Sequence, residues 1–278
     1  MTRRRGLLVA LVGLSLLGLG LAASAAKVTI TGSTTVLPIA QAVAEALADK
    51  YEIEVSGGGS SVGVASLIDG TTDIADHSRP MKGKEYARAV ENSVFPFTFH
   101  VANDAIAVIV HPSNPIADLT LDQLKAIFTG EVTHWVQLDA NFPVPGAKIV
   151  PVGRDSASGT FETWENLVVS GADPATSVAA LPANAAVADH VAQNPSAIGY
   201  VGLAYVTPNH KQLTVGGKAA TLETALNYTY PIARPLFMST SGFPNPGAVL
   251  DVILFVLSDA GQRIVQEIGY APIRILGE

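Results

Sequence analysis

The sequence predicts an α/β fold with two lobes, in which each lobe is a mixed sheet flanked by helices and two long strands cross between the lobes. Short β-branched segments alternate with segments of helical periodicity, which is typical of a sheet with helices on its faces. Two extended segments, 97–110 and 230–238, are longer than a strand of one small sheet needs to be. The chain has 278 residues, of which 48% are hydrophobic, enough for one large domain or two of ordinary size.

The first third of the chain repeats the order strand, turn, helix. Its expected strands are β-branched or alternate in polarity, and its expected helices carry apolar residues three or four positions apart. The strands are expected at 27–30, 51–55 and 73–75, and the helices at 36–50 and 62–68.

The rest of the chain continues this alternation and returns to the first lobe. Pro231 and Pro235 indicate that the second extended segment is an edge or a crossing, because proline cannot donate to a strand ladder. Further helices are expected at 119–128, 159–169 and 247–268, and further strands at 144–152 and 198–202. Lobe I is therefore expected to contain residues 27–103 and 235–278, and lobe II residues 104–234.

The N-terminal residues 1–25 have the layout of a secretory signal peptide. Arg3, Arg4 and Arg5 precede an uncharged stretch that ends in the small-x-small pattern Ala23-Ser24-Ala25. An uncleaved membrane anchor is the alternative, because an apolar run of this length can just span a bilayer. The chain has no cysteine, which excludes a lipid-modified cysteine, disulfides and thiolate metal sites. We expect a periplasmic or secreted protein.

The charge of the chain restricts its partners. The formal net charge is −7, and it becomes −10 once the three arginines of the signal are removed. A surface of this sign does not attract nucleic acid or anionic lipid, and it repels small anions at long range. Any anion site must therefore act at short range through donors aimed at the ligand.

Three turns between a strand and a helix share one design, at residues 32–35, 57–61 and 154–160. Each combines glycine with small hydroxyl side chains. A helix start presents unpaired N–H groups and the positive end of the helix dipole, so it can bind an anion. Helix capping is the better explanation of any one of these turns taken alone, because Ser, Thr and Gly are the usual residues before a helix. Three such turns in one chain favour a shared anion site.

Two arginines lie beside these turns. Arg154 opens the third turn, and a guanidinium can hold a tetrahedral oxyanion with two parallel hydrogen bonds. Its neighbour Asp155 is expected to orient it. Ser78 and Arg79 follow the strand at 73–75, where a loop would face the same cleft. Arg79 either faces that cleft or forms a structural ion pair with Asp73 or Asp76.

Enzyme and metal motifs are lacking in the sequence. The six histidines are scattered without the spacing of a helical metal site, and neither a Gly-x-Ser-x-Gly elbow nor a nucleotide phosphate loop is present. We therefore expect a protein that is not an enzyme and that carries no cofactor and no metal.

Several segments resemble the phosphate-binding proteins of the phosphate-specific ABC transporter, a family with the type II periplasmic binding protein fold. Residues 31–38 are similar to the family's first phosphate loop, and residues 58–64 and 73–79 to its second and third. Residues 153–160 resemble its Arg-x-x-x-Ser-Gly-Thr loop, the most specific of the four. The resemblance covers nearly all of the chain after residue 26.

The resemblance implies a ligand, its contacts and a partner. The ligand is inorganic phosphate, the partner is a set of ABC permease subunits, and the protein is a monomer. Ser78 stands where well-known enteric members carry an aspartate that accepts the proton of hydrogen phosphate and rejects sulfate, and Arg79 follows it, as in other members. Thr35 stands where those enteric members carry a phenylalanine. The contacts implied are Thr34, Thr35 and Ser60 on lobe I, and Arg154, Ser158, Gly159 and Thr160 on lobe II.

We expect phosphate capture by closure of the two lobes, with delivery to the permease and no chemistry. One alternative is the same fold with sulfate, molybdate or tungstate as ligand. A second is a secreted phosphatase or other hydrolase that uses Ser60 or Ser158 as nucleophile. A third is an adhesion or scavenging protein that acts without a permease.

Overall fold

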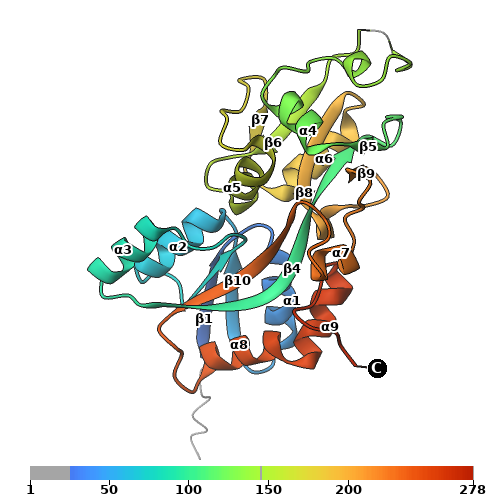
Figure 1. Ribbon diagram of the computed structural model, residues 1–278. Coiled ribbons are helices and arrows are strands. Elements are labelled where there is room, and N and C mark those ends of the chain that lie inside the picture. The colour runs from blue at the N-terminus through green and yellow to red at the C-terminus, as the bar shows by residue number, and fades with distance from the viewer. Residues whose placement is uncertain (1–25, 145, 278) are drawn as a thin grey trace, which may run out of the picture.

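The computed structural model describes residues 26–144 and 146–277. The predicted signal sequence, and with it the choice between a cleaved signal and an anchor, lies outside these residues. Within them, ten strands join in a sheet that continues from one lobe into the other (Figure 1). None of the helices described is both long and apolar enough to cross a bilayer.

The sheet of lobe I contains β1, β2, β3, β10 and the first part of β4 (Pro96–Val110), with helices on both faces. β1, β2 and β3 are parallel, and β10 joins β3 in the antiparallel sense. Helices α1, α8 and α9 pack on one face in a common apolar cluster with β1, β3 and β10, whereas α2 and α3 form a smaller cluster. The strands are β1 (Lys27–Gly32), β2 (Glu52–Ser56), β3 (Ile74–His77) and β10 (Ala233–Ser241); the helices are α1 (Leu37–Ala46), α2 (Ser60–Ile68), α3 (Gly83–Glu91), α8 (Ala248–Leu257) and α9 (Asp259–Ile268).

Lobe II encloses the larger apolar cluster. Trp164 stacks on Tyr200 with ring centroids 4.1 Å apart, and Phe128 packs edge-on against Trp164. Both tryptophans therefore belong to the core of this lobe. Its strands are β5 (Asp118–Leu119), β6 (Val150–Arg154), β7 (Ala179–Leu181), β8 (Ala197–Gly202) and β9 (Lys211–Val215); its helices are α4 (Leu121–Phe128), α5 (Gly159–Trp164), which continues as a π-helical turn (Glu165–Val169), α6 (Asn184–Gln193) and α7 (Leu222–Leu226).

β4 (Pro96–Val110) and β10 connect the lobes. β4 pairs with β10 as far as Ala105, and from Ile106 onward it pairs with β8. The two apolar clusters also meet at this point of β4. Pro235 lies inside the antiparallel pair of the two crossing strands, next to a register shift at Leu236, so this segment is a crossing and not an edge. These observations support lobe boundaries near residues 103 and 235, which we keep as a proposal.

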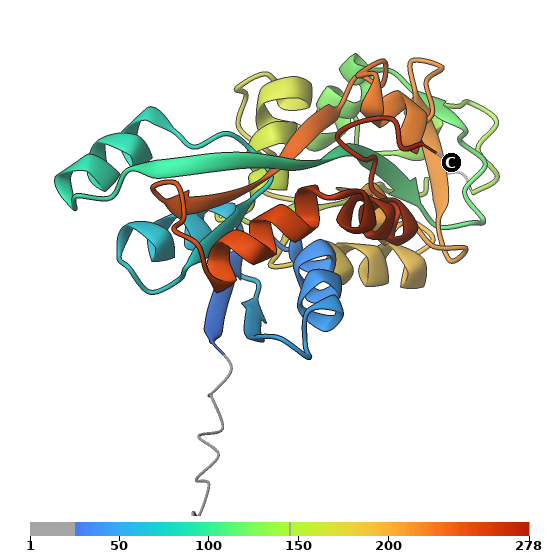
Figure 2. The same cartoon turned by 90° about the horizontal axis from the view of Figure 1, so that it is seen from below.

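The expected helix at 247–268 is wrong in one respect, because the chain forms two helices there (Figure 2). Ser258 takes an extended conformation between α8 and α9, and its hydroxyl accepts a hydrogen bond from the Gly261 N–H at 3.2 Å. A Cβ on Gly261 would lie 2.1 Å from the Phe255 carbonyl oxygen, so only glycine permits this sharp turn. Apolar periodicity alone does not reveal the break because it continues through both helices.

Candidate oxyanion-binding site

The three glycine- and hydroxyl-rich turns meet between the lobes. They lie at the carboxyl ends of β1, β2 and β6, where the helices α1, α2 and α5 follow. Each turn is bonded to both of the others, and two of these bonds join lobe I to lobe II. The three hydrogen bonds run from Gly59 N–H to Gly32 O (2.8 Å), from Ser61 N–H to Ala157 O (3.1 Å), and between the hydroxyls of Thr35 and Thr160 (3.0 Å).

Two glycines permit this close approach. Gly32 has φ +147°, and a Cβ there would lie 2.1 Å from the Asp76 carbonyl oxygen. Gly59 has φ +106°, and a Cβ there would lie 2.5 Å from the Ala157 carbonyl oxygen of the opposite lobe. Any side chain at Gly59 would therefore push the lobes apart.

Ser158 both caps a helix and keeps a donor. It lies before α5 with extended backbone, and its oxygen accepts hydrogen bonds from the N–H groups of Thr160 (3.1 Å) and Phe161 (3.2 Å). Its hydroxyl proton takes no part in this cap. Capping and ligand binding, which the sequence posed as rival explanations, are thus compatible at this position.

Gly159 lies against two serines of lobe I. A Cβ on Gly159 would be 2.3 Å from the Ser60 hydroxyl and 2.7 Å from the Ser78 hydroxyl. The Ser60 oxygen accepts a hydrogen bond from the Ser78 N–H at 3.0 Å, and the two hydroxyls lie 3.3 Å apart. Both serines are fully buried. The start of α5 and these two hydroxyls therefore form one group of donors.

Arg154 lies in the same region, held by backbone carbonyls. Its Nε donates to Leu181 O at 3.1 Å and its Nη2 to Pro182 O at 2.8 Å, and it is 3% exposed. These two bonds leave the Nη1 edge for another acceptor. The expected orienting role of Asp155 is wrong, because its carboxylate accepts from the Ala157 N–H instead. Burial lowers the pKa of Arg154, although a guanidinium stays charged at physiological pH.

Arg79 has partners other than those expected. Its two terminal nitrogens donate to the two carboxylate oxygens of Glu85 at 2.7 Å, and also to Pro80 O and the Ser61 hydroxyl. Its Nε lies 2.7 Å from a carboxylate oxygen of Glu162, across the cleft. Its four terminal N–H groups therefore donate to protein acceptors, whereas its Nε lies within ion-pair distance of Glu162 without forming a hydrogen bond, and neither Asp73 nor Asp76 is among these partners. Arg79 thus has no terminal N–H group left for a ligand.

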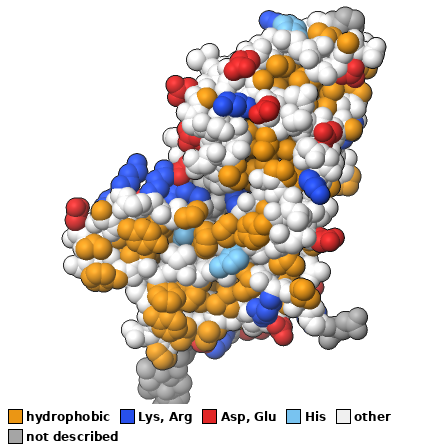
Figure 3. Space-filling view, viewed as in Figure 1, with side chains coloured by type: hydrophobic (Ala, Val, Ile, Leu, Met, Phe, Trp, Pro, Cys, Tyr) orange, Lys and Arg blue, Asp and Glu red, His pale blue; other side chains and the backbone are white. Residues whose placement is uncertain are grey.

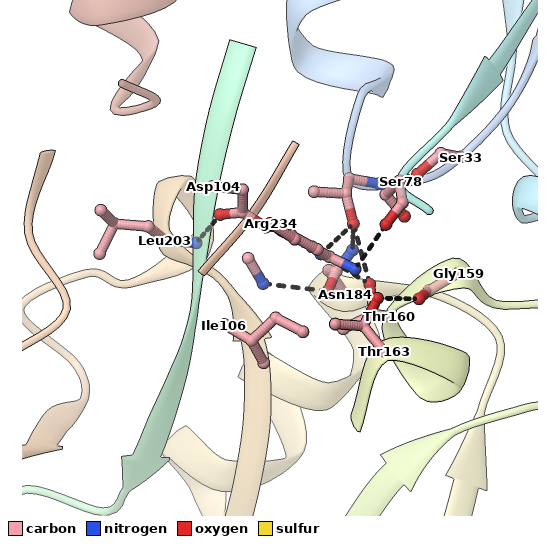
Figure 4. A network of polar contacts seen from close by, with 12 residues as sticks. Ser33, Ser78, Asp104, Ile106, Gly159, Thr160, Thr163, Asn184, Leu203 and Arg234 are labelled. Atoms are coloured by element: carbon pink, nitrogen blue, oxygen red, sulfur yellow. Dashed lines mark hydrogen bonds and ion pairs between the residues drawn. The ribbon is translucent and has the colours of Figure 1, made fainter. Parts of the chain in front are cut away.

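The sequence did not reveal a polar network beside these turns (Figure 4). Arg234 of β10 is 3% exposed and forms an ion pair with Asp104 of β4, which is fully buried. Asn184, the first residue of α6, donates to the hydroxyls of Thr34 (3.2 Å) and Thr35 (3.0 Å). One signal was available, because Asp104 is a lone acidic residue within an apolar strand and such a residue needs a buried partner.

Lysine and arginine side chains line the cleft edge although the chain as a whole is negative. Lys and Arg side chains gather where lobe I faces lobe II (Figure 3). A groove of about 370 Å³ opens there, and it is lined by Arg79, Lys82 and Glu162 together with Arg234. Arg79, Lys82 and Arg234 are each paired with a carboxylate, so their charges are compensated within or beside the groove.

The chain matches a family model described as the PBP superfamily domain over residues 20–260. It is 32% identical over 239 residues to the phosphate-binding protein PstS of Pseudomonas aeruginosa, covering 80% of this chain and 74% of that protein. The PstS of Staphylococcus aureus is also 32% identical, over 86% of this chain and 76% of its own. The chain belongs to the PstS family.

Two solved structures are similar to this chain over most of its length. One is a putative phosphate ABC transporter substrate-binding protein with bound phosphate from Clostridium perfringens, with a TM-score of 0.82, 32% identity, and coverage of 89% of this chain and all of that one. Another is an ABC-type phosphate transport receptor from Vibrio cholerae, with a TM-score of 0.69, 28% identity, and coverage of 88% and 99%. The predicted type II periplasmic binding protein fold is confirmed.

Proposed function

We propose that this protein binds inorganic phosphate between its two lobes and delivers it to the permease of an ABC transporter. The observation that carries the proposal is the meeting of three helix starts from two lobes, joined pairwise by hydrogen bonds. Such a group of N–H and hydroxyl donors suits a compact tetrahedral anion with acceptors on every side. The family relatives, named as phosphate-binding proteins, support the same ligand.

The proposed contacts follow the geometry of the turns. Lobe II contributes the charged Nη1 edge of Arg154 and the donors at the start of α5, and lobe I contributes the hydroxyls that face them. Arg79, which we expected to be a contact, is not included because its four terminal N–H groups donate to protein acceptors and its Nε faces Glu162. The residues proposed to contact phosphate are Thr34, Thr35, Ser60, Ser78, Arg154, Ser158, Gly159 and Thr160.

Binding and lobe closure are coupled in this proposal. A ligand that needs donors from both lobes interacts more strongly with the closed arrangement, and it shifts the equilibrium by that difference in affinity. The permease then recognises the closed shape. We also propose that the protein works as a monomer outside the cytoplasm after removal of residues 1–25.

The serine at position 78 bears on anion selectivity. A carboxylate can only accept, so it would reject sulfate, which has no proton to donate, whereas a hydroxyl can accept or donate. Ser78 therefore permits hydrogen phosphate without excluding sulfate by charge. We expect weaker discrimination against sulfate than a site with a carboxylate would show.

The test is native mass spectrometry of the purified protein, followed by calorimetric titration with phosphate, sulfate and molybdate. Bound phosphate, with affinity above that for the other two anions, is the expected result. Tighter binding of sulfate or molybdate would assign the site to that anion instead. Turnover of a chromogenic phosphate ester would favour the hydrolase alternative, and absence of binding to any oxyanion would refute the proposal.

A further inference from the structure

Arg234 lies on one of the two strands that connect the lobes, and it contacts residues of both lobes. It lies on the crossing strand β10, directly opposite Asp104 of the crossing strand β4. Its Nε and Nη2 donate to one oxygen of Asp104 at 3.0 and 2.8 Å, and the other oxygen accepts from the Leu203 N–H at 2.9 Å. Burial raises the pKa of Asp104, and the three donors to its carboxylate oppose that rise because they favour the ionised form.

A buried ion pair of this kind is costly to build. Removing two charges from water costs several kcal/mol each, and replacement by apolar residues is often neutral or stabilising. The pair is therefore weak evidence for a role in stability. Its position beside the anion site points to another role.

The guanidinium of Arg234 contacts hydroxyl groups of both lobes that are proposed to bind phosphate. Nη2 has two hydrogens for three acceptors, so one points to Asp104 and the other is shared between the Thr35 hydroxyl of lobe I (3.1 Å) and the Thr160 hydroxyl of lobe II (3.0 Å). Nη1 donates to Ser78 O at 3.3 Å. Among the described residues, no other acceptor is bonded to Nη1, so one of its two hydrogens is free for a further acceptor. Arg234 also lines the groove between the lobes.

The network determines where the hydroxyl protons point. Gly202 N–H donates to the Asn184 oxygen at 3.2 Å, so the Asn184 amide nitrogen faces Thr35. The Thr35 oxygen accepts from Asn184 and from Arg234, and its proton therefore goes to Thr160, 3.0 Å away. The Thr160 oxygen accepts from Thr35 and Arg234, which uses both of its lone pairs. The proton of Thr160 is left to donate elsewhere.

Resting on the proposed function, we propose that Arg234, oriented by Asp104, is a specificity-determining residue of the oxyanion site. It supplies a second guanidinium besides Arg154, and it makes the Thr160 hydroxyl a donor only. This side of the site then accepts only unprotonated oxygens of the ligand. The proton of hydrogen phosphate must face the Ser60 and Ser78 hydroxyls on the other side, where a lone pair is available.

The proposal predicts a preference for the phosphate dianion. The monoanion carries two protons, and the site has one side that can accept a proton. Affinity should therefore rise as phosphate loses its second proton. Burial raises the pKa of every tyrosine around Arg234 and also that of Asp104, and the arginines stay charged. The titratable and charged neighbours are Asp104 on β4, Arg154 on β6, Tyr200 on β8, Tyr205 after β8, Tyr230 before β10 and Tyr270 after α9, with the pKa of Tyr205 raised to about 12. Arg79, Lys82 and Glu162 line the same groove as Arg234. On β3, the strand paired with β10, burial raises the pKa of Asp76 and lowers that of His77.

The test is calorimetric titration of phosphate on either side of its second pKa, in the parent and in two variants. Arg234→Lys keeps the charge but cannot bridge Asp104 and both threonines. The double variant Asp104→Asn with Arg234→Gln removes both charges together, so that neither is left buried alone. Arg263→Gln, at an exposed position on α9, is the matched control for the loss of one positive charge.

We expect both Arg234 variants to bind phosphate about 10- to 100-fold more weakly at the higher pH, with a smaller loss at the lower pH. The control should bind as the parent does. If either variant unfolds cooperatively and binds phosphate within threefold of the parent at both pH values, the role of Arg234 is refuted while the proposed function stands. If the parent itself fails to bind phosphate, the proposed function fails.

Discussion

Glu162 is the residue whose change should separate lobe closure from ligand contact. It lies on α5 of lobe II, its side chain is 9% exposed, and two cations of lobe I approach it. Arg79 Nε is 2.7 Å and Lys82 Nζ 2.8 Å from its carboxylate oxygens. Glu162 is not among the residues proposed to contact phosphate. Glu162→Gln therefore removes an attraction that exists only when the lobes are together, and it leaves the ligand contacts in place.

The two ion pairs of Glu162 make different contributions to the free energy of lobe closure. Lys82 is 39% exposed, so its pair contributes about 0–1 kcal/mol after solvent screening. Arg79 is 5% exposed, and close buried charge pairs across an interface show coupling of about 1.5 kcal/mol or more. Arg79 keeps Glu85 in the variant, so its charge is not left alone. If the free energy of lobe closure becomes about 1–2 kcal/mol less favourable, phosphate binding should weaken by a factor of about 5–30.

The assay combines calorimetry with stopped-flow dissociation and small-angle scattering. Phosphate should leave Glu162→Gln faster, and the variant should need more phosphate to reach the compact form. Glu131→Gln, at an exposed position of lobe II, is the control and should behave as the parent does. Affinity within twofold of the parent, with an unchanged dissociation rate, would show that these ion pairs do not hold the lobes together.

Three further variants test the site and its surroundings. Arg154→Ala should weaken phosphate binding by about 2–5 kcal/mol in calorimetry, because a buried anion loses a charged donor, and binding within twofold of the parent would remove Arg154 from the site. Gly159→Ala should abolish tight binding without lowering the melting temperature of the free protein, because its Cβ would lie 2.3 Å from the Ser60 hydroxyl and oppose closure; unchanged affinity would contradict this geometry. Burial lowers the pKa of His77 to about 4 from 6.5. The neutral ring stabilises the fold fully above pH 6.5, and about 3 kcal/mol is lost as the pH falls from 6.5 through 4. The free energy of unfolding of His77→Gln, measured in urea, should therefore depend less on pH in this range than that of the parent. The same pH dependence in parent and variant would refute the lowered pKa of His77.

Local pattern predicted the elements whose signal is contained in a short segment. The strands at 27–30 and 51–55 and the first two helices appear close to their expected places, because periodicity and glycine-rich turns act locally. The strand expected at 144–152 begins only at Val150. Helices α3, α6 and α7 were not predicted. The break at Ser258 was missed because a single extended residue leaves the apolar pattern intact.

The glycine and hydroxyl turns were found from sequence because their chemistry depends on residues that are neighbours in the chain. The partners of the arginines were not found, because they come from distant segments. Arg79 and Glu162 are 83 positions apart in the sequence, and Arg234 and Asp104 are 130 positions apart. Asn184 reaches Thr35 across 149 positions.

By itself, the sequence determined the family, the two-lobed α/β class and the three turns that meet at the site. Only the tertiary structure decided which charged groups face the ligand and which face one another. The physical reason is that burial makes an arginine dependent on whatever carboxylate or carbonyl lies within about 3 Å, and that distance is set by packing of the lobes and not by position along the chain.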